Sequence, residues 1–230
     1  MMYGYAWDTS SSPNFAISIL PILGFGLIVT LQATVVGFAI ALVLGLVLAL
    51  LRRSHIKAIS WTVAGFTEFV RDTPLLVQLL FLYYVLPDFG IVLPAFMTGA
   101  LALGLQYSAY TSEVYRAGIN AVQRGQWEAA IALNLTRLQT YRDIVVPQMI
   151  PRIVPALGNY LVSMLKETPV LSVVTVLDML GLANMIGERT FDYLVPLSVV
   201  GLIFLPLTLL CSAIIYTLER ALPKSGIPLR

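Results

Sequence analysis

The sequence predicts an all-α membrane protein with five transmembrane helices, its N-terminus outside and its C-terminus in the cytoplasm. Three observations support this fold class. Only 11% of the 230 residues are charged and 58% are hydrophobic, whereas soluble domains usually carry about 25% charged residues. Residues 15–51 include no charged side chain, and about 20 apolar residues are enough for a helix to cross the hydrocarbon core. Lys and Arg gather in the loops of one side, which points to the cytoplasm.

Five apolar runs define the predicted spans, because Pro, Gly or charged residues interrupt the hydrophobic sequence between them. Their approximate bounds are 22–51, 60–86, 91–118, 153–176 and 192–218. The predicted organisation is an extracytoplasmic tail with the start of the first span (1–21), one membrane domain (22–218) and a cytoplasmic tail (219–230).

Basic residues set the predicted orientation, because Lys and Arg near span ends stay in the cytoplasm. An odd number of spans with an outer N-terminus places Arg189 outside, while Arg71 and Lys166 fall within spans. The other basic residues are then cytoplasmic: Arg52, Arg53, Lys57, Arg116, Arg124, Arg137, Arg142, Arg152, Arg220, Lys224 and Arg230.

The chain shows no internal repeat of 20–50 residues, and its second half does not mirror the first. Many secondary transporters contain such a duplication. Five spans without one suggest half of an assembly, which another copy or a sister chain would complete.

The longest polar interval, RGQWEAAIALNLTRLQTYRDIVVPQ, covers residues 124–148. Its first part places Trp127, Ala130, Ile131 and Leu135 on one helical side by their spacing of three to four residues. This pattern predicts a short helix with one apolar side.

The same interval contains a predicted corner. Asn134 tolerates the left-handed conformation that often ends a helix, and Thr136 with Gln139 matches a capping box. We therefore expect two short helices joined by a tight turn, with Pro147 redirecting the next element. Spacing alone leaves open whether this elbow docks a partner or is a solvated connector on the membrane surface.

Several motifs together resemble one family. The run Glu128–Ala130 followed by Ile144–Gln148 is similar to the EAA loop of bacterial ABC importer permeases. Glu68–Leu79 resembles the second-span signature of the polar amino-acid permeases, of the histidine, glutamate and glutamine type, and Tyr110–Ile119 resembles the end of their third span. Arg124–Gln126 precedes the EAA motif at the usual distance. The resemblance covers nearly the whole chain and is specific for the family, though not for its substrate.

The resemblance implies the transmembrane domain of a type I ABC importer (MetI-like) in the bacterial cytoplasmic, or inner, membrane. Its partners would be a cytoplasmic ABC ATPase dimer, a second permease subunit and an extracytoplasmic solute-binding protein. The EAA loop would be the coupling helix that seats in a groove of the ATPase. The implied coupling residues are Gly125, Glu128, Ala129, Ala130, Asn134 and Arg137.

Two features qualify this resemblance. The family usually has Gly where this chain has Asn134, and relatives more often carry two small hydroxyl residues where it has Thr168-Pro169. No G-x-x-x-x-G-K-[ST] motif is present, so ATP hydrolysis is expected on a separate subunit.

The fourth span contains the main candidates for solute contact. Lys166 and Glu167 are ionisable residues at membrane depth, which are costly and often functional. With Thr168 they precede Pro169, which cannot donate to the helix ladder, so a break is expected here. Glu167 could meet the amino group of a zwitterion and Lys166 its carboxylate. A mutual or inter-subunit salt bridge that only shapes the pathway is the alternative.

Three further polar residues are candidates for the substrate pathway. Gln78 and Gln106 lie within spans and either line the pathway or form hydrogen bonds between helices. Asp178 follows the fourth span and could line the outer mouth.

The start of the second span carries candidates for gating or structure. Glu68 and Arg71 are three residues apart and could pair on one helical face. Thr73 and Pro74 form the expected kink. The depth of Asp72 and these charges in the membrane is left open.

Other function classes are weaker. The single histidine, His55, has no catalytic or metal constellation around it, so we expect no enzyme activity, no metal site and no cofactor. Nothing indicates nucleic-acid binding. An ATPase-independent secondary transporter or channel for small zwitterions is the main rival, and a receptor-like scaffold is a third. The cargo, whether an amino acid or a derivative such as an ectoine-like compatible solute, cannot be chosen from these residues.

Overall fold

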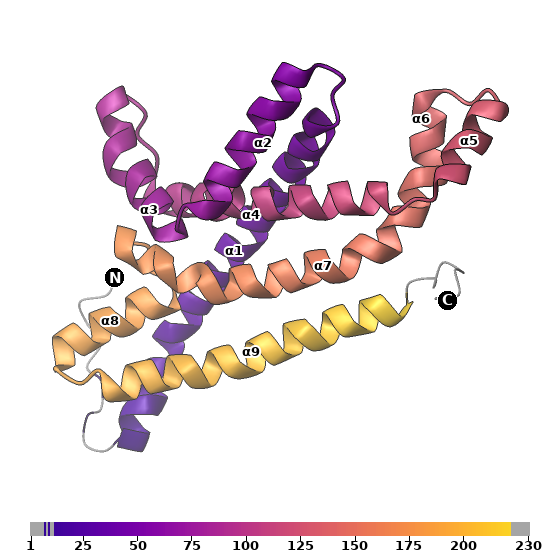
Figure 1. The fold of residues 1–230 in the computed structure, drawn as a ribbon. Helices are drawn as coiled ribbons and strands as arrows, with labels where there is room; N and C mark the ends of the chain where they lie inside the picture. Colours follow the sequence, from indigo (N-terminus) through magenta and orange to yellow (C-terminus); the bar gives the residue numbers. More distant parts are fainter. Residues whose placement is uncertain (1–6, 8, 10–11, 222–230) are drawn as a thin grey trace. The chain divides into compact units, whose positions relative to one another are not determined.

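The computed structural model describes residues 7, 9 and 12–221 and is helical throughout that part, without strands (Figure 1). This confirms the predicted all-α class. The α-helices are α1 (Ser12–Arg52), α2 (Lys57–Asp72), α3 (Leu75–Leu80), α4 (Ala95–Asn120), α5 (Arg124–Ala132), α6 (Arg137–Gln139), α7 (Val146–Glu167), α8 (Met179–Thr190) and α9 (Leu194–Ala221). Two π-helical turns, Phe81–Val85 and Thr140–Val145, and two 3-10 helices, Leu86–Phe89 and Thr168–Val174, complete the set.

The chain divides into two compact units, and α1, α4, α7 and α9 each contribute a segment to both. Unit 1 comprises Met1–Phe38, Pro74–Leu103 and Ser163–Leu210. Unit 2 comprises Ala39–Thr73, Gly104–Val162 and Cys211–Arg230. The predicted tail beyond Ala221, with Lys224 and Arg230, lies outside the described residues.

The core of unit 1 joins three helices. Its buried residues come from α1 (Phe15, Ile19, Ile22, Leu23), α8 (Met179, Leu182, Ala183, Ile186) and α9 (Val195, Val199, Val200). Gly26 allows close approach here, because a Cβ added to it would lie 2.7 Å from the Cα of Met179. Small residues serve this purpose where membrane helices associate by van der Waals packing.

The core of unit 2 packs α4 against α7 and the end of α1. Its buried residues are Ala49, Tyr115, Ile119, Val122, Val145, Met149 and Ile153. Gly45 makes the tightest approach, since a Cβ there would lie 2.0 Å from Oγ1 of Thr111. That hydroxyl donates a hydrogen bond of 2.8 Å to the carbonyl of Ala41. A small residue and a threonine therefore fix α4 against α1.

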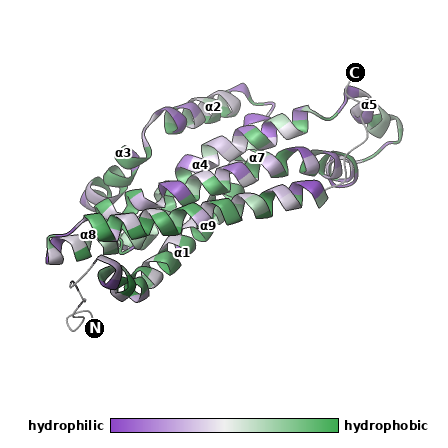
Figure 2. Cartoon of the chain, turned by 90° about the horizontal axis from the view of Figure 1, so that it is seen from below, coloured by the Kyte–Doolittle hydropathy of each residue, from purple (hydrophilic) through white to green (hydrophobic). Residues whose placement is uncertain are grey.

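Within the part of the chain that the structure describes, two helices, α1 and α9, are long and apolar enough to cross a membrane by themselves, and their hydrophobic residues run along their length in Figure 2. Up to four spans result if Lys57–Asp72 with Leu75–Phe89, and Arg137–Val174 with Met179–Thr190, each count as one interrupted span. Helix α1 also starts at Ser12, well before the predicted span. The count of five spans and the orientation of the termini stay predictions.

The helix α8 was not predicted from the sequence. It starts after Asp178, whose carboxylate accepts a hydrogen bond of 2.9 Å from the backbone N–H of Gly181. An aspartate at this position satisfies one of the unpaired N–H groups of a helix start. Asp178 followed by an apolar run was the available signal for this helix start.

Candidate functional site

The elbow, which we define as residues 124–140, contains the predicted corner. Helix α5 ends at Ala132, and Asn134 has a φ of 56°, which confirms the predicted left-handed residue. The N–H of Leu135 donates to the carbonyl of Ala130 at 3.0 Å, and that of Asn134 to Ile131 at 2.9 Å. These two bonds form a Schellman motif, which satisfies carbonyls that a helix end leaves unpaired.

The capping box on the other side of the corner is also confirmed. The hydroxyl of Thr136 accepts from the backbone N–H of Gln139 at 3.3 Å, and the Gln139 side chain accepts from the backbone N–H of Thr136 at 2.9 Å. Both sides of the corner therefore have their backbone groups paired, which makes the turn geometry well determined.

The prediction of a second short helix was wrong. From Arg137 the chain stays helical through the π-turn Thr140–Val145 and on to Glu167 in α7. Pro147 sits in the first turn of α7 rather than at a break. Proline has no backbone N–H to donate to the preceding turn. The π-turn just before Pro147 is wider than an α-helical turn and changes the hydrogen bonding at that point, so the helix continues. The second arm of the elbow is thus the start of a long helix.

The predicted coupling residues are mostly exposed. Gly125, Glu128, Ala129 and Arg137 are exposed, whereas Ala130 is 1% exposed. A carboxylate oxygen of Glu128 accepts from Nε of Arg124 at 3.0 Å, so Glu128 is paired within the elbow.

The elbow also exposes large apolar side chains. Ile131, Leu133 and Leu138 are 75%, 71% and 77% exposed. Apolar side chains grouped on one exposed element are typical of a surface that another molecule covers. The elbow is thus built as a rigid, partly apolar projection.

The predicted apolar side of α5 lines a pocket of about 650 Å³ in unit 2. All four residues assigned to that side, Trp127, Ala130, Ile131 and Leu135, belong to its wall. Trp127 also packs edge-on against Tyr141, with ring centroids 5.6 Å apart. The periodicity of the sequence therefore identified this side correctly, although it gave no sign of a pocket.

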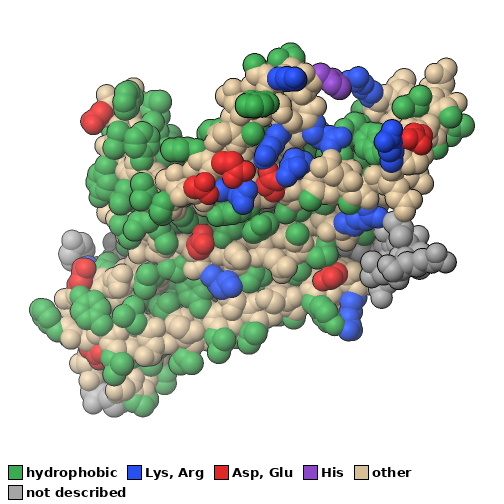
Figure 3. All heavy atoms as spheres, in the orientation of Figure 1, with side chains coloured by type: hydrophobic (Ala, Val, Ile, Leu, Met, Phe, Trp, Pro, Cys, Tyr) green, Lys and Arg blue, Asp and Glu red, His purple; other side chains and the backbone are tan. Residues whose placement is uncertain are grey.

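A chain of charged side chains joins three helices of unit 2. Figure 3 shows acidic and basic side chains gathered over α2 and α4. Arg71 pairs with Glu68 at 3.5 Å, which confirms the predicted pair on α2. Arg52, at the end of α1, lies 4.0 Å from Glu68 and also pairs with Glu113 on α4. Arg116 donates to Glu113 at 3.0 Å through Nε.

Glu113 is therefore the centre of this charge chain, and it is not among the residues predicted to be functional from the sequence. It lies in the motif Tyr110–Ile119 and is three residues before Arg116, which was the available signal. Its side chain is only 23% exposed and accepts from two arginines. The pairing with Arg52, 61 residues away, could not be found from local spacing.

The predicted kink at Thr73-Pro74 is an interruption of the helix. Helix α2 ends at Asp72, the Thr73 hydroxyl donates to the carbonyl of Phe69 at 2.7 Å, and α3 starts at Leu75. Thr73 belongs to unit 2 and Pro74 to unit 1. The interruption therefore coincides with a boundary between the units.

The predicted break in the fourth span is confirmed. Helix α7 ends at Glu167 and the chain continues as the 3-10 helix Thr168–Val174, with Pro169 in its first turn. Thr168 is fully buried and donates to the carbonyl of Leu165 at 2.7 Å. Lys166 and Glu167 are both exposed, and no ion pair joins them or links either to another described residue.

The other pathway candidates are buried. Gln78, in unit 1, is 8% exposed, and its helix α3 packs against the 3-10 helix Thr168–Val174. Gln106, in unit 2, donates to the hydroxyl of Tyr110 at 3.2 Å on the same helix. Tyr110 in turn stacks on Tyr160, with centroids 5.4 Å apart. The roles of Gln78 and Gln106 in the substrate pathway stay predictions.

Asp178, which was expected to line the outer mouth, is buried within the single chain. Its side chain is fully buried, one carboxylate oxygen caps α8, and the adjacent N–H of Met179 donates to Oγ1 of Thr30 at 3.3 Å. The N–H of Met179, next to the capping Asp178, thus connects the start of α8 to α1 within unit 1. Among the described residues no group of three or more His, Cys, Asp or Glu could hold a metal ion.

Comparison with known families decides the class of this chain. Residues 41–224 match the family model described as "Binding-protein-dependent transport system inner membrane component". The chain belongs to this family. It is therefore a membrane component of an ABC importer and resides in the inner membrane. Membership of this family implies an ATPase and a binding protein as partners.

Individual relatives agree with the family. The chain is 58% identical, over the full length of both chains, to a probable amino-acid ABC transporter permease protein, y4tG, of Sinorhizobium fredii. It is 37% identical to the arginine transport system permease protein ArtQ of Bacillus subtilis, covering 90% of this chain and 94% of ArtQ.

Solved structures share the fold. A crystal structure of an amino acid ABC transporter with histidines has a TM-score of 0.83 and 40% identity, covering 90% of this chain and 96% of that one. The inward-facing MetNI methionine ABC transporter has a TM-score of 0.74 at 19% identity, covering 90% and 98%, which supports the fold alone.

Proposed function

We propose that this chain is the permease subunit of an ATP-driven importer that moves a polar amino acid, or an amino-acid-derived zwitterion such as an ectoine-like solute, across the inner membrane. The relatives named for amino-acid transport support the substrate class. In the proposed assembly five spans cross with the N-terminus outside. Two permease copies, or this chain and a sister chain, bind a cytoplasmic ATPase dimer and receive solute from an external binding protein.

The elbow carries this proposal. Its corner is fixed by the Schellman motif at Asn134 and by the capping box, and it presents exposed apolar side chains. The arm that starts at Arg137 continues directly into α7. A push on α5 by the ATPase would therefore reach the long helix through two paired turns, as a movement of packed elements rather than a bending of a loose loop.

Glu128→Arg tests the coupling role. The exposed Arg124–Glu128 pair contributes only roughly 0.3–0.5 kcal/mol to stability, so the variant should fold normally. We expect the ATPase to copurify less with the variant and uptake in proteoliposomes to fall at least about tenfold, as a loss of about 1.4 kcal/mol of coupling would produce.

Asp143→Arg is the matched control, because Asp143 is another exposed carboxylate that pairs with a neighbouring arginine, here Arg142 at 3.5 Å. It should leave copurification and uptake near the unchanged level. Normal uptake and ATPase stimulation by the Glu128→Arg assembly would overturn the coupling role. Transport by the purified chain without any ATPase would favour the rival secondary transporter.

A further inference from the structure

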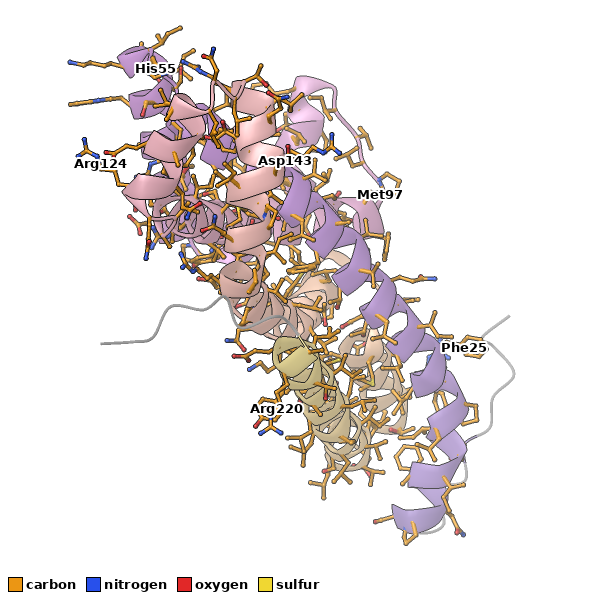
Figure 4. The ribbon with its side chains drawn as sticks, turned by 90° about the vertical axis from the view of Figure 1, so that its right-hand side faces the viewer. Phe25, His55, Met97, Arg124, Asp143 and Arg220 are labelled. Atoms are coloured by element: carbon orange, nitrogen blue, oxygen red, sulfur yellow. The ribbon has the colours of Figure 1, made fainter. Side chains whose placement is uncertain are left out.

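The basic pocket, which we define as the 650 Å³ cavity of unit 2, has two walls. The first consists of the last turn of α1 and the turn that follows it, and includes Leu50, Arg53 and Ile56. The second is the elbow with Trp127 and Arg137. In Figure 4, His55, another lining residue, and Arg124 on α5 mark this end of unit 2.

The charge of the pocket is not balanced by its own walls. No Asp or Glu is among the lining residues. Arg53 donates to the neutral side chain of Asn120, and the ion pairs of the described residues include neither Arg53 nor Arg137. Two guanidinium groups thus face a cavity with donors available for an anion, and Arg is well suited to phosphate.

The rest of the wall is apolar and aromatic. Leu50 belongs both to the pocket and to the uncharged run that ends at Leu51, so the cavity is continuous with the hydrophobic surface of α1. Ile56 and Ile131 add exposed aliphatic area, and the ring of Trp127 adds an aromatic wall. Tryptophan is typical of the level of lipid headgroups.

We propose that the basic pocket binds the headgroup of an anionic phospholipid from the cytoplasmic leaflet. The phosphate would lie against Arg53 and Arg137, and the glycerol and upper acyl chain against Leu50 and Ile56. Basic pockets at the cytoplasmic ends of membrane helices recognise such headgroups. The choice of leaflet rests on the proposed orientation. A soluble anion would not need the apolar wall, and an acidic protein segment would not need a cavity continuous with α1.

Native mass spectrometry of the full-length chain tests this with phosphatidylglycerol and phosphatidylcholine mixed in the detergent. We expect phosphatidylglycerol to be retained preferentially. Each of Arg53→Gln and Arg137→Gln should weaken retention about fivefold, the equivalent of about 1 kcal/mol per basic residue. Ile131→Glu, at a side chain that is 75% exposed, adds an anion to the wall without disturbing the core and should act in the same direction.

The matched control is Arg142→Gln, which removes an arginine that is 83% exposed and does not line the pocket. It should retain phosphatidylglycerol normally. Equal retention of both lipids, or equal loss with Arg142→Gln, would overturn the proposal. So would displacement of the lipid by glycerol phosphate alone, which would indicate a soluble anion, or by the ATPase subunit, which would indicate a docking site for that protein.

The coupling role is separable from this result, because it is measured by uptake and copurification with Glu128→Arg. If the protein retains both lipids equally while uptake still depends on ATP and Glu128, only the proposal for the basic pocket fails. If the Ser54→Cys variant reacts at that position with an impermeant thiol reagent from outside intact cells, the proposed orientation fails and the leaflet assignment fails with it.

Discussion

At the scale of single residues, Asn134 decides the geometry of the elbow. Its φ of 56° lies in the left-handed region, which costs most L-residues about 1–2 kcal/mol, and Asn tolerates it better than others. The family resemblance led us to expect glycine here. The structure shows why asparagine suffices, since the backbone bonds of the Schellman motif form with it in place.

We expect Asn134→Gly to keep or slightly raise the thermal midpoint, and Asn134→Val to lower the free energy of unfolding by about 1–2 kcal/mol, because a β-branched residue is disfavoured at positive φ. Thermal unfolding of the purified chain in detergent measures both. Leu133→Val is the control, since Leu133 is similarly exposed but has a φ of −84°. If both valine variants are equally stable, the turn does not depend on the left-handed residue.

At the scale of elements, the charge chain from Arg71 through Glu68, Arg52 and Glu113 to Arg116 holds α1, α2 and α4 of unit 2 together. The guanidinium of Arg71 also lies 5.8 Å from the centroid of the Tyr110 ring. Hydrogen bonds to charged groups that are partly withdrawn from solvent are worth more than exposed pairs. Arg52 and Glu113, in the middle of this chain of charges, should therefore contribute more to stability than the arginines at its two ends.

Glu113→Gln should destabilise the protein by about 1.5–3 kcal/mol, because it removes the charge that two arginines share. Denaturant unfolding of the detergent-solubilised chain gives this value. Asp143→Asn, which affects an exposed pair of neighbouring residues, is the control and should cost less than about 1 kcal/mol. Equal stability of the two variants would show that the chain of charges contributes no more than surface pairs do.

At the scale of the whole molecule, Lys166 and Glu167 are unexplained by the single chain. Both are exposed at a helix break within a predominantly apolar sequence, and neither pairs with another described residue. Ionisable groups at membrane depth usually face protein or water. We therefore infer that the complete assembly of permeases encloses them, either against the solute or against the second permease.

Glu167→Gln distinguishes these roles in the assembled importer. If Glu167 meets the amino group of the solute, uptake should fall at least about tenfold while solute affinity of the binding protein and basal ATPase activity stay unchanged, since a neutral amide loses a charge-assisted bond worth about 1.5–3 kcal/mol. Proteoliposome uptake and binding measurements provide the test. Unchanged uptake would contradict direct contact, and loss of assembly would indicate an inter-subunit bridge.

Local signals along the chain were sufficient for much of the site. The capping box at Thr136, the left-handed Asn134, the break before Pro169 and the end of a helix at Thr73 all depend on residues within one or two turns of each other. Local signals were not sufficient at Pro147, where a π-turn lets the helix continue, and they did not predict the helix that Asp178 caps.

Composition, periodicity and turn chemistry are enough to predict a helical membrane protein with a capped elbow, because they act over short distances along the chain. The tertiary structure adds that Glu113 joins Arg52 and Arg116, that the N–H of Met179 bonds Thr30, and that Arg53 and Arg137 line one pocket. These contacts bring together residues far apart in sequence, and side-chain charge and packing select them only once the helices are folded against each other.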